Sequence, residues 1–338
     1  MSNEIDRVLC ADWSKDVSKR AVYEVMVSER LIRRVAGQDW TVSSVLQLAG
    51  GQSKTLVTFD APLGVPASFF HALRADPSDG SPRTFVEWLP NAALEEALTA
   101  AAWAVRRPFF RVPAGRGGLR GFEAAAAARG VALRRKIERE TGAKPVFVVA
   151  GVPGSVGSAA RDIWRGLTGS RRQGTEFRVW PFEGGLGQLL GSGVPVVAEI
   201  YPRAAYSTAL IDAAPRPRLA VSKTRARVRL CAIRDLLATQ WVATTGVQIR
   251  DTDAAAQGED DFDALMTGAA LFRCLAEGLP LFAEPLHRPE AEGGILGTGS
   301  VDLAMRERAF RPPLCVSGLI DPAQETKATE RAGTGGAW

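Results

Sequence analysis

The chain has 338 residues, of which 46% are hydrophobic, enough apolar side chain to bury one large core or two ordinary ones. The N-terminus lacks a signal-peptide layout and no run of about 18 apolar residues occurs, so we expect neither secretion nor membrane spanning. Four well-separated cysteines and only two histidines indicate a cytoplasmic protein with reduced thiols and argue against a zinc site or a Ser-His-Asp triad.

Four short segments near the N-terminus have the apolar pattern of strands: residues 8–12, 21–27, 30–36 and 55–60. The first reads as a strand buried on both faces, because its apolar residues are continuous. The second and third predict an antiparallel meander. Thr41 can cap a helix that lies before the fourth strand and stops at Gly50. The first and fourth strands each end in an acid, Asp12 and Asp60.

The middle of the chain interrupts this pattern and is basic. Residues 67–190 contain 18 Arg or Lys and 11 Asp or Glu, so their net charge is +7, whereas the whole chain carries +5. We predict three helices, at residues 91–105, 123–140 and around Trp164, and strands at residues 145–150 and 177–182. No long polar linker flanks this region, which therefore reads as a mainly helical insertion packed on the core. Its charge fits a surface that faces a polyanion, although surplus arginine is also common in Ala- and Gly-rich proteins.

The strand pattern resumes with a buried segment at residues 194–200, in which Glu199 takes the place of the earlier strand-end acids. Helices are predicted at residues 204–211, 224–242 and 261–277, an acidic loop at 251–260 and a strand at 293–299. We therefore assign residues 1–66 and 191–320 to a split core. Residues 321–338 are expected to be a disordered tail.

Acids at the ends of separate strands would repel one another if they met. Asp260 and Asp263 add two more, spaced i and i+3 on one face of the last helix. A divalent metal is the simplest account of such a pattern. Taken singly, each acid has a plainer explanation, since strand-end Asp residues often cap turns and first-turn acids are favoured by the helix dipole.

The order of these elements resembles the ribonuclease H-like fold, a mixed five-stranded sheet flanked by helices. GEDDFDALMTGAA is similar to the D-x-x-D-A signature on the final helix of RuvC-type resolvases. More closely, the chain is similar to the family called domain of unknown function 429. Five segments carry this resemblance: ADWSKD (11–16), FDAPLGVP (59–66), EIYPRAAYS (199–207), SK with a basic helix (222–230) and D-x-x-D-A (260–264).

The resemblance implies a metal-dependent nuclease acting on DNA or RNA. By it, Asp12 would bridge two ions, Asp60 would be the fourth-strand acid, and Asp260 with Asp263 would complete the site. Oxygen ligands select Mg²⁺ or Mn²⁺. Two such ions about 3.5–4 Å apart can hold the attacking water and the departing 3′ oxygen of a phosphodiester.

Two further residues are candidates for catalysis. Lys223 could support phosphate charge. Glu199 could be a catalytic acid, or could instead orient Lys223 or a metal-bound water. A lysine at a helix entry is more often solvated, and the arginines that follow it read as the exposed face of their helix: Arg225, Arg227, Arg229 and Arg234.

A Gly- and Arg-rich connection in the insertion is a candidate nucleic-acid contact. Its arginines are Arg106, Arg107, Arg111, Arg116 and Arg120. Together with Phe109 and Phe110 they could bind phosphates and stack on bases. In the plainer alternative, the connection is a surface loop whose two phenylalanines fill the core.

Two other functions remain open. A non-catalytic nucleic-acid-binding or assembly protein could keep the same fold. An actin-like ATP-handling enzyme would follow its first-strand Asp with small residues that let backbone amides approach phosphate, whereas Trp13 follows Asp12 here.

Overall fold

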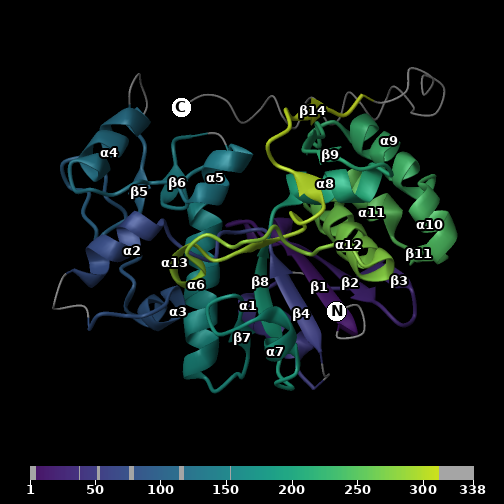
Figure 1. Ribbon diagram of the computed structural model, residues 1–338, viewed down its shortest axis with the longest axis horizontal. Coiled ribbons are helices and arrows are strands. Elements are labelled where there is room, and N and C mark those ends of the chain that lie inside the picture. The colour runs from purple at the N-terminus through teal and green to yellow at the C-terminus, as the bar shows by residue number, and fades with distance from the viewer. Residues whose placement is uncertain are drawn as a thin grey trace.

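The computed structural model describes residues 5–37, 39–51, 54–75, 80–113, 118–152 and 154–311. Its centre is an eight-stranded mixed sheet in the order β11-β3-β2-β1-β4-β8-β12, with β7 also paired to β8, and helices pack on both faces (Figure 1). The predicted tail at 321–338 lies outside the described residues. Within these ranges, no helix combines the length and the apolar character needed to cross a membrane.

Five longer strands form the body of the sheet: β1 (Arg7–Asp12), β2 (Ala21–Met26), β3 (Leu31–Arg34), β4 (Thr55–Phe59) and β8 (Val196–Ile200). β2 is antiparallel to both β1 and β3, whereas β1, β4 and β8 are parallel. The sequence predicted all five. Three two-residue strands extend the sheet: β7 (Arg178–Val179), β11 (Gln248–Ile249) and β12 (Ile295–Leu296). β7 and β12 lie within the strands predicted at 177–182 and 293–299, whereas β11 was not predicted.

The sheet separates two hydrophobic cores. Leu9 and Ala11 of β1 belong to one core, which includes residues of α1 (Val42–Ala49) and α6 (Gly157–Arg172). Val8 and Cys10 belong to the other, which includes residues of α8 (Pro202–Leu210) and α12 (Glu259–Glu277). Because successive residues of a strand face opposite sides, residues 8–11 of β1 are all apolar and buried, as their continuous pattern predicted.

The insertion contains short elements: α2 (Ala67–Arg74), α3 (Phe85–Trp88), a 3-10 helix (Leu89–Asn91), β5 (Phe110–Arg111), α4 (Gly118–Ala127), α5 (Lys136–Thr141), β6 (Val148–Ala150), α6 and α7 (Leu186–Leu190). The helix predicted at 123–140 is instead split into α4 and α5, and the turn between them contains Gly130 at φ 69°. Left-handed backbone of this kind favours glycine and ends a helix.

The alanine-rich helix predicted at residues 91–105 is also wrong. Ala97 N–H donates to the carbonyl of Phe109 at 2.7 Å, and Arg111 N–H donates to the carbonyl of Ala97 at 3.2 Å. The Trp103 indole is fully buried and donates to the carbonyl of Pro108 at 3.0 Å. Pairing with the β5 segment thus outweighs the helix propensity of alanine, which is a weak preference.

The C-terminal third differs from prediction in two places. The helix predicted at 224–242 is two helices, α9 (Ala226–Leu237) and α10 (Gln240–Thr245), and the predicted acidic loop contains a helix, α11 (Thr252–Gln257).

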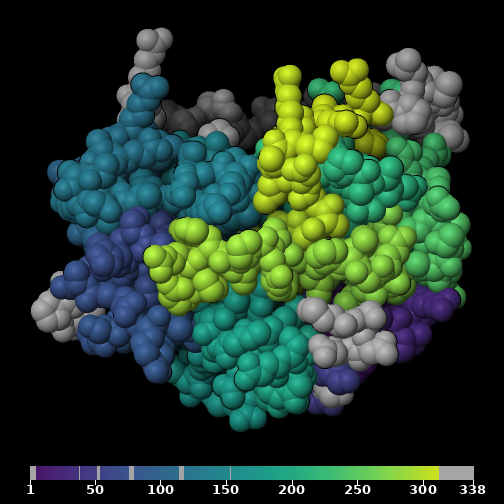
Figure 2. Space-filling model, viewed as in Figure 1, coloured from purple at the N-terminus to yellow at the C-terminus, as the bar shows by residue number. Residues whose placement is uncertain are grey.

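Figure 2 shows the chain after α12 running across the front of the molecule, from the insertion to the core. The remaining elements are a 3-10 helix (Val17–Lys19), α13 (Pro289–Glu292), β9 (Arg216–Pro217), β10 (Leu219–Ala220), β13 (Val301–Asp302) and β14 (Arg308–Ala309).

Candidate metal site

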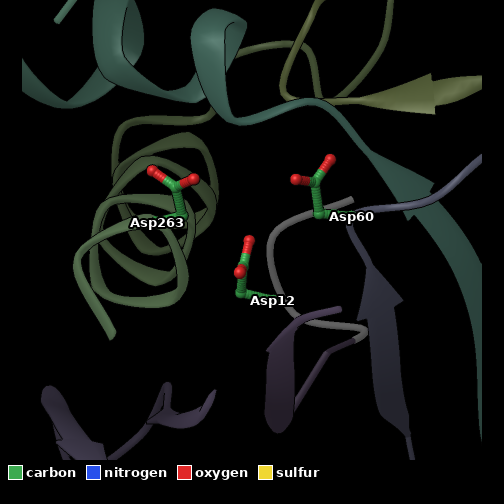
Figure 3. Close-up of side chains that lie close together, drawn as sticks. All are labelled: Asp12, Asp60 and Asp263. Carbon is green, nitrogen blue, oxygen red and sulfur yellow. The ribbon is translucent and has the colours of Figure 1, made fainter. Parts of the chain in front are cut away.

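Three acidic side chains meet at one edge of the sheet. Asp12 is the last residue of β1, Asp60 directly follows β4, and Asp263 lies in the second turn of α12. β1 and β4 are parallel neighbours, so their carboxyl ends lie side by side. One carboxylate oxygen from each residue lies within 4.8 Å of the others. Figure 3 shows the three carboxyl groups around a shared space between α12 and the two strands.

The three carboxyl groups differ in their partners. Asp263 is 1% exposed; the Tyr206 hydroxyl donates to its Oδ1, and the Lys223 ammonium group pairs with its Oδ2. Asp12 is 5% exposed, and in the described part of the chain no N–H group donates to its carboxylate. A buried acid without such donors is costly to ionise. Asp12 and Asp60 hydrogen-bond to each other, so the pair can share a proton or, when both are ionised, bind a cation.

Burial and mutual repulsion raise the pKa of these acids. For Asp12 the larger cause is burial, followed by the negative charges of Asp263 and Asp60. The same causes, burial first and then Asp263, raise the pKa of Asp60 to about 7. Burial also raises the pKa of Asp263, although the nearby Lys223 charge opposes this. The group cannot be fully ionised at neutral pH at low cost unless a cation is present, and its oxygen-only donors suit Mg²⁺ or Mn²⁺.

Asp260 lies in the first turn of α12 and is only partly buried. Its carboxylate is not one of the three that converge, although its charge contributes to raising the pKa of Asp12 and of Asp263. Of the two acids that the sequence placed on one helix face, the structure therefore brings only the second into the cluster.

Glu199 is held elsewhere. It is buried in β8, and both of its oxygens accept from the Arg135 guanidinium, at 2.7 Å each. The backbone N–H of Leu63 also donates to it at 2.7 Å. Glu199 therefore neither joins the three acids nor orients Lys223. Its charge contributes to raising the pKa of Asp60, and its bond to Leu63 fixes the turn that follows Asp60.

Sequence reasoning missed two residues of this site. Tyr206 lies in α8 and had only the resemblance of its segment as a signal. Arg229 was read as exposed but is 4% exposed. Its guanidinium donates to the carbonyls of Ala256 at 3.0 Å and Gln257 at 2.7 Å, and to that of Lys223. Arg229 thus joins the Lys223 segment to the end of α11, directly before α12.

The predicted arginine loop lies apart from these acids. Phe109 and Phe110 are fully buried, and Phe110 stacks on Phe122 with ring centroids 4.2 Å apart, so neither is available to stack on a base. Figure 1 places β5 and α4 at the opposite side of the molecule from α12. Of the five arginines, Arg106, Arg107 and Arg120 are exposed, Arg111 pairs with Glu96 at 3.2 Å, and Arg116 is outside the described residues.

Comparison of the chain with known protein families, with curated proteins and with solved structures finds no match. The resemblance to domain of unknown function 429 therefore stays a prediction.

Proposed function

We propose that this protein is a metal-dependent phosphodiester hydrolase with a ribonuclease H-like core. The observation that carries the proposal is the convergence of Asp12, Asp60 and Asp263 within 4.8 Å, with Asp12 and Asp263 buried and Asp60 partly buried. The order of elements supports it, because the acids stand on the first strand, the fourth strand and the last long helix, as the resemblance predicts.

The residues present fit a hard divalent cation, since they offer only carboxylate oxygens. When bound, such an ion would polarise a phosphate oxygen and orient a water molecule. The protein itself would hold the substrate phosphate near Lys223, whose side chain is 35% exposed beside Asp263. An ammonium group there can neutralise charge on a non-bridging oxygen.

The loop after Asp12 argues against an ATP-handling enzyme. The Trp13 indole is buried, donates to Asp162 at 2.9 Å and packs edge-on against Phe59 with ring centroids 5.0 Å apart. This side chain fills the space beside the strand end, where a phosphate-binding loop would need small residues.

The test is hydrolysis of a panel of labelled single-stranded, duplex and branched DNA and RNA, with Mn²⁺, with Mg²⁺ or with a chelator. We expect cleavage only with metal, and a loss of roughly 100-fold or more for Asp12→Asn, which removes a negative ligand. Asp253→Asn, an exposed acid in α11, is the control and should cleave normally. A non-catalytic binding protein would give no cleavage with any substrate, and Asp12→Asn would bind nucleic acid as the wild type does.

Nucleic acid as the partner has its own test. Replacing Arg107 and Arg120 together with alanine should weaken binding and flatten its salt dependence, by up to about 0.9 in slope for each arginine that contacts a phosphate. Affinity measured at several salt concentrations gives that slope. Arg30 and Arg250 are also exposed but lie beside β11, so their double alanine variant is the control. Equal slopes for the two variants would remove the loop from the binding surface.

A further inference from the structure

The Lys223 ammonium group occupies the side of the acidic cluster formed by Asp263. It pairs with Oδ2, while Tyr206 donates to Oδ1, so each oxygen of Asp263 already has a partner. Asp12 and Asp60, in contrast, receive no such bond from an N–H group in the described ranges. Asp263 is therefore already paired with a cation, the Lys223 ammonium group, whereas Asp12 and Asp60 are not.

Hydrogen bonds to the backbone of Lys223 fix its position. Its backbone N–H donates to the carbonyl of Val221 at 2.8 Å, and its carbonyl accepts from the buried guanidinium of Arg229. Because Arg229 also binds the carbonyls of Ala256 and Gln257, the segment that carries the lysine is attached to the end of α11, directly before the helix that carries Asp263. The buried Arg229 side chain thus helps to hold Lys223 in place for its pairing with Asp263.

Charge balance then limits how many ions the site can hold. One ammonium group and one divalent ion neutralise three carboxylates, whereas a second divalent ion would leave an excess of positive charge among buried groups, which is costly. Asp260 adds a further negative charge, but it is partly solvated at the rim, where water screens it.

We infer that the site binds a single divalent ion, between Asp12 and Asp60, and that the Lys223 ammonium group serves as the second cation. This inference rests on the proposed function and narrows it, because the sequence resemblance implied two ions. The lysine would then neutralise charge on the phosphate or on the departing oxygen, opposite the metal.

The experiment is calorimetry of the full chain with Mn²⁺, supported by electron paramagnetic resonance, which counts free Mn²⁺. We expect one ion per wild-type chain. Lys223→Ala should bind the first ion at least 10-fold more tightly and should take up a second, because a competing positive charge is gone. Lys223→Arg keeps the charge and should still bind one. Lys136→Ala, an exposed lysine in α5, is the control and should match the wild type.

The outcomes separate this inference from the proposed function. Two ions in the wild type would overturn the inference and leave the metal-dependent hydrolase standing. An unchanged affinity and a single ion in Lys223→Ala would also overturn it. No binding by the wild type would overturn both. If Lys223→Ala fails to fold by circular dichroism, the count in the wild type and in Lys223→Arg still decides.

Discussion

Arg135→Met should lower the free energy of unfolding by roughly 3–5 kcal/mol, because it leaves buried carboxylates without their partner. Arg135 is 1% exposed, and its guanidinium binds Glu199 with two hydrogen bonds of 2.7 Å and Glu138 with one of 2.8 Å. The same group donates to the carbonyl of Glu292 at 3.1 Å. Methionine fills similar volume but supplies none of these donors.

Denaturant unfolding at pH 7.5 measures this loss. Adding Glu199→Gln to Arg135→Met should recover part of it, because one unpaired charge is removed. The loss should also be smaller at pH 5. Burial raises the pKa of Glu199 and of Glu138, so in the variant these carboxyl groups take up protons as the pH falls. A carboxyl group whose pKa is raised in the folded state stabilises that state when it is protonated. Arg139→Met is the control, because Arg139 is an exposed residue of α5, the helix that Arg135 caps. A loss no larger than that of the control would contradict the prediction.

Asp60→Asn should have the opposite effect and stabilise the metal-free protein at pH 8. With a pKa of about 7 in the folded state against an ordinary value of 3.8, Asp60 favours folding when protonated, and this contribution disappears as the pH rises through 7. Each pKa unit corresponds to about 1.4 kcal/mol. Because the side chain keeps some contact with solvent, we expect a gain of roughly 2–4 kcal/mol at pH 8 and almost none at pH 4.

Thermal unfolding in a chelator at both pH values tests this. Asp253→Asn again serves as the control and should give no gain at pH 8. Adding Mn²⁺ should raise the melting temperature of the wild type but not of Asp60→Asn, because the variant lacks a charged ligand. If Asp60→Asn were instead less stable than the wild type at pH 8, the acid would be satisfied by a partner other than a metal.

The central strands were predictable because their own residues specify them. β1, β4 and β8 are mostly apolar and buried on both faces, as in a strand that is covered on both sides. Their parallel pairing brings Asp12 and Asp60 to one edge. The position of Asp263 also followed from its place on a helix that packs on the sheet.

Other parts of the site depend on contacts that sequence position does not reveal. Glu199 has the same local pattern as Asp12, and only Arg135, 64 residues away in the chain, determines that it forms an ion pair instead of joining the cluster. In the sequence, Arg229 has the pattern of a surface arginine, and only the fold shows that it binds the carbonyls at the end of α11. Likewise, the alanines of residues 91–105 favour a helix by themselves, and the neighbouring β5 segment overrides that preference.

The central place of β1 has a consequence for how the protein is made. β1 is synthesised about 250 residues before α12, which packs on it. Contacts so distant in the chain slow folding and leave apolar strands uncovered meanwhile. Until α12 has been synthesised, the apolar face of β1 that it covers stays exposed, and the incomplete chain is prone to aggregate through it.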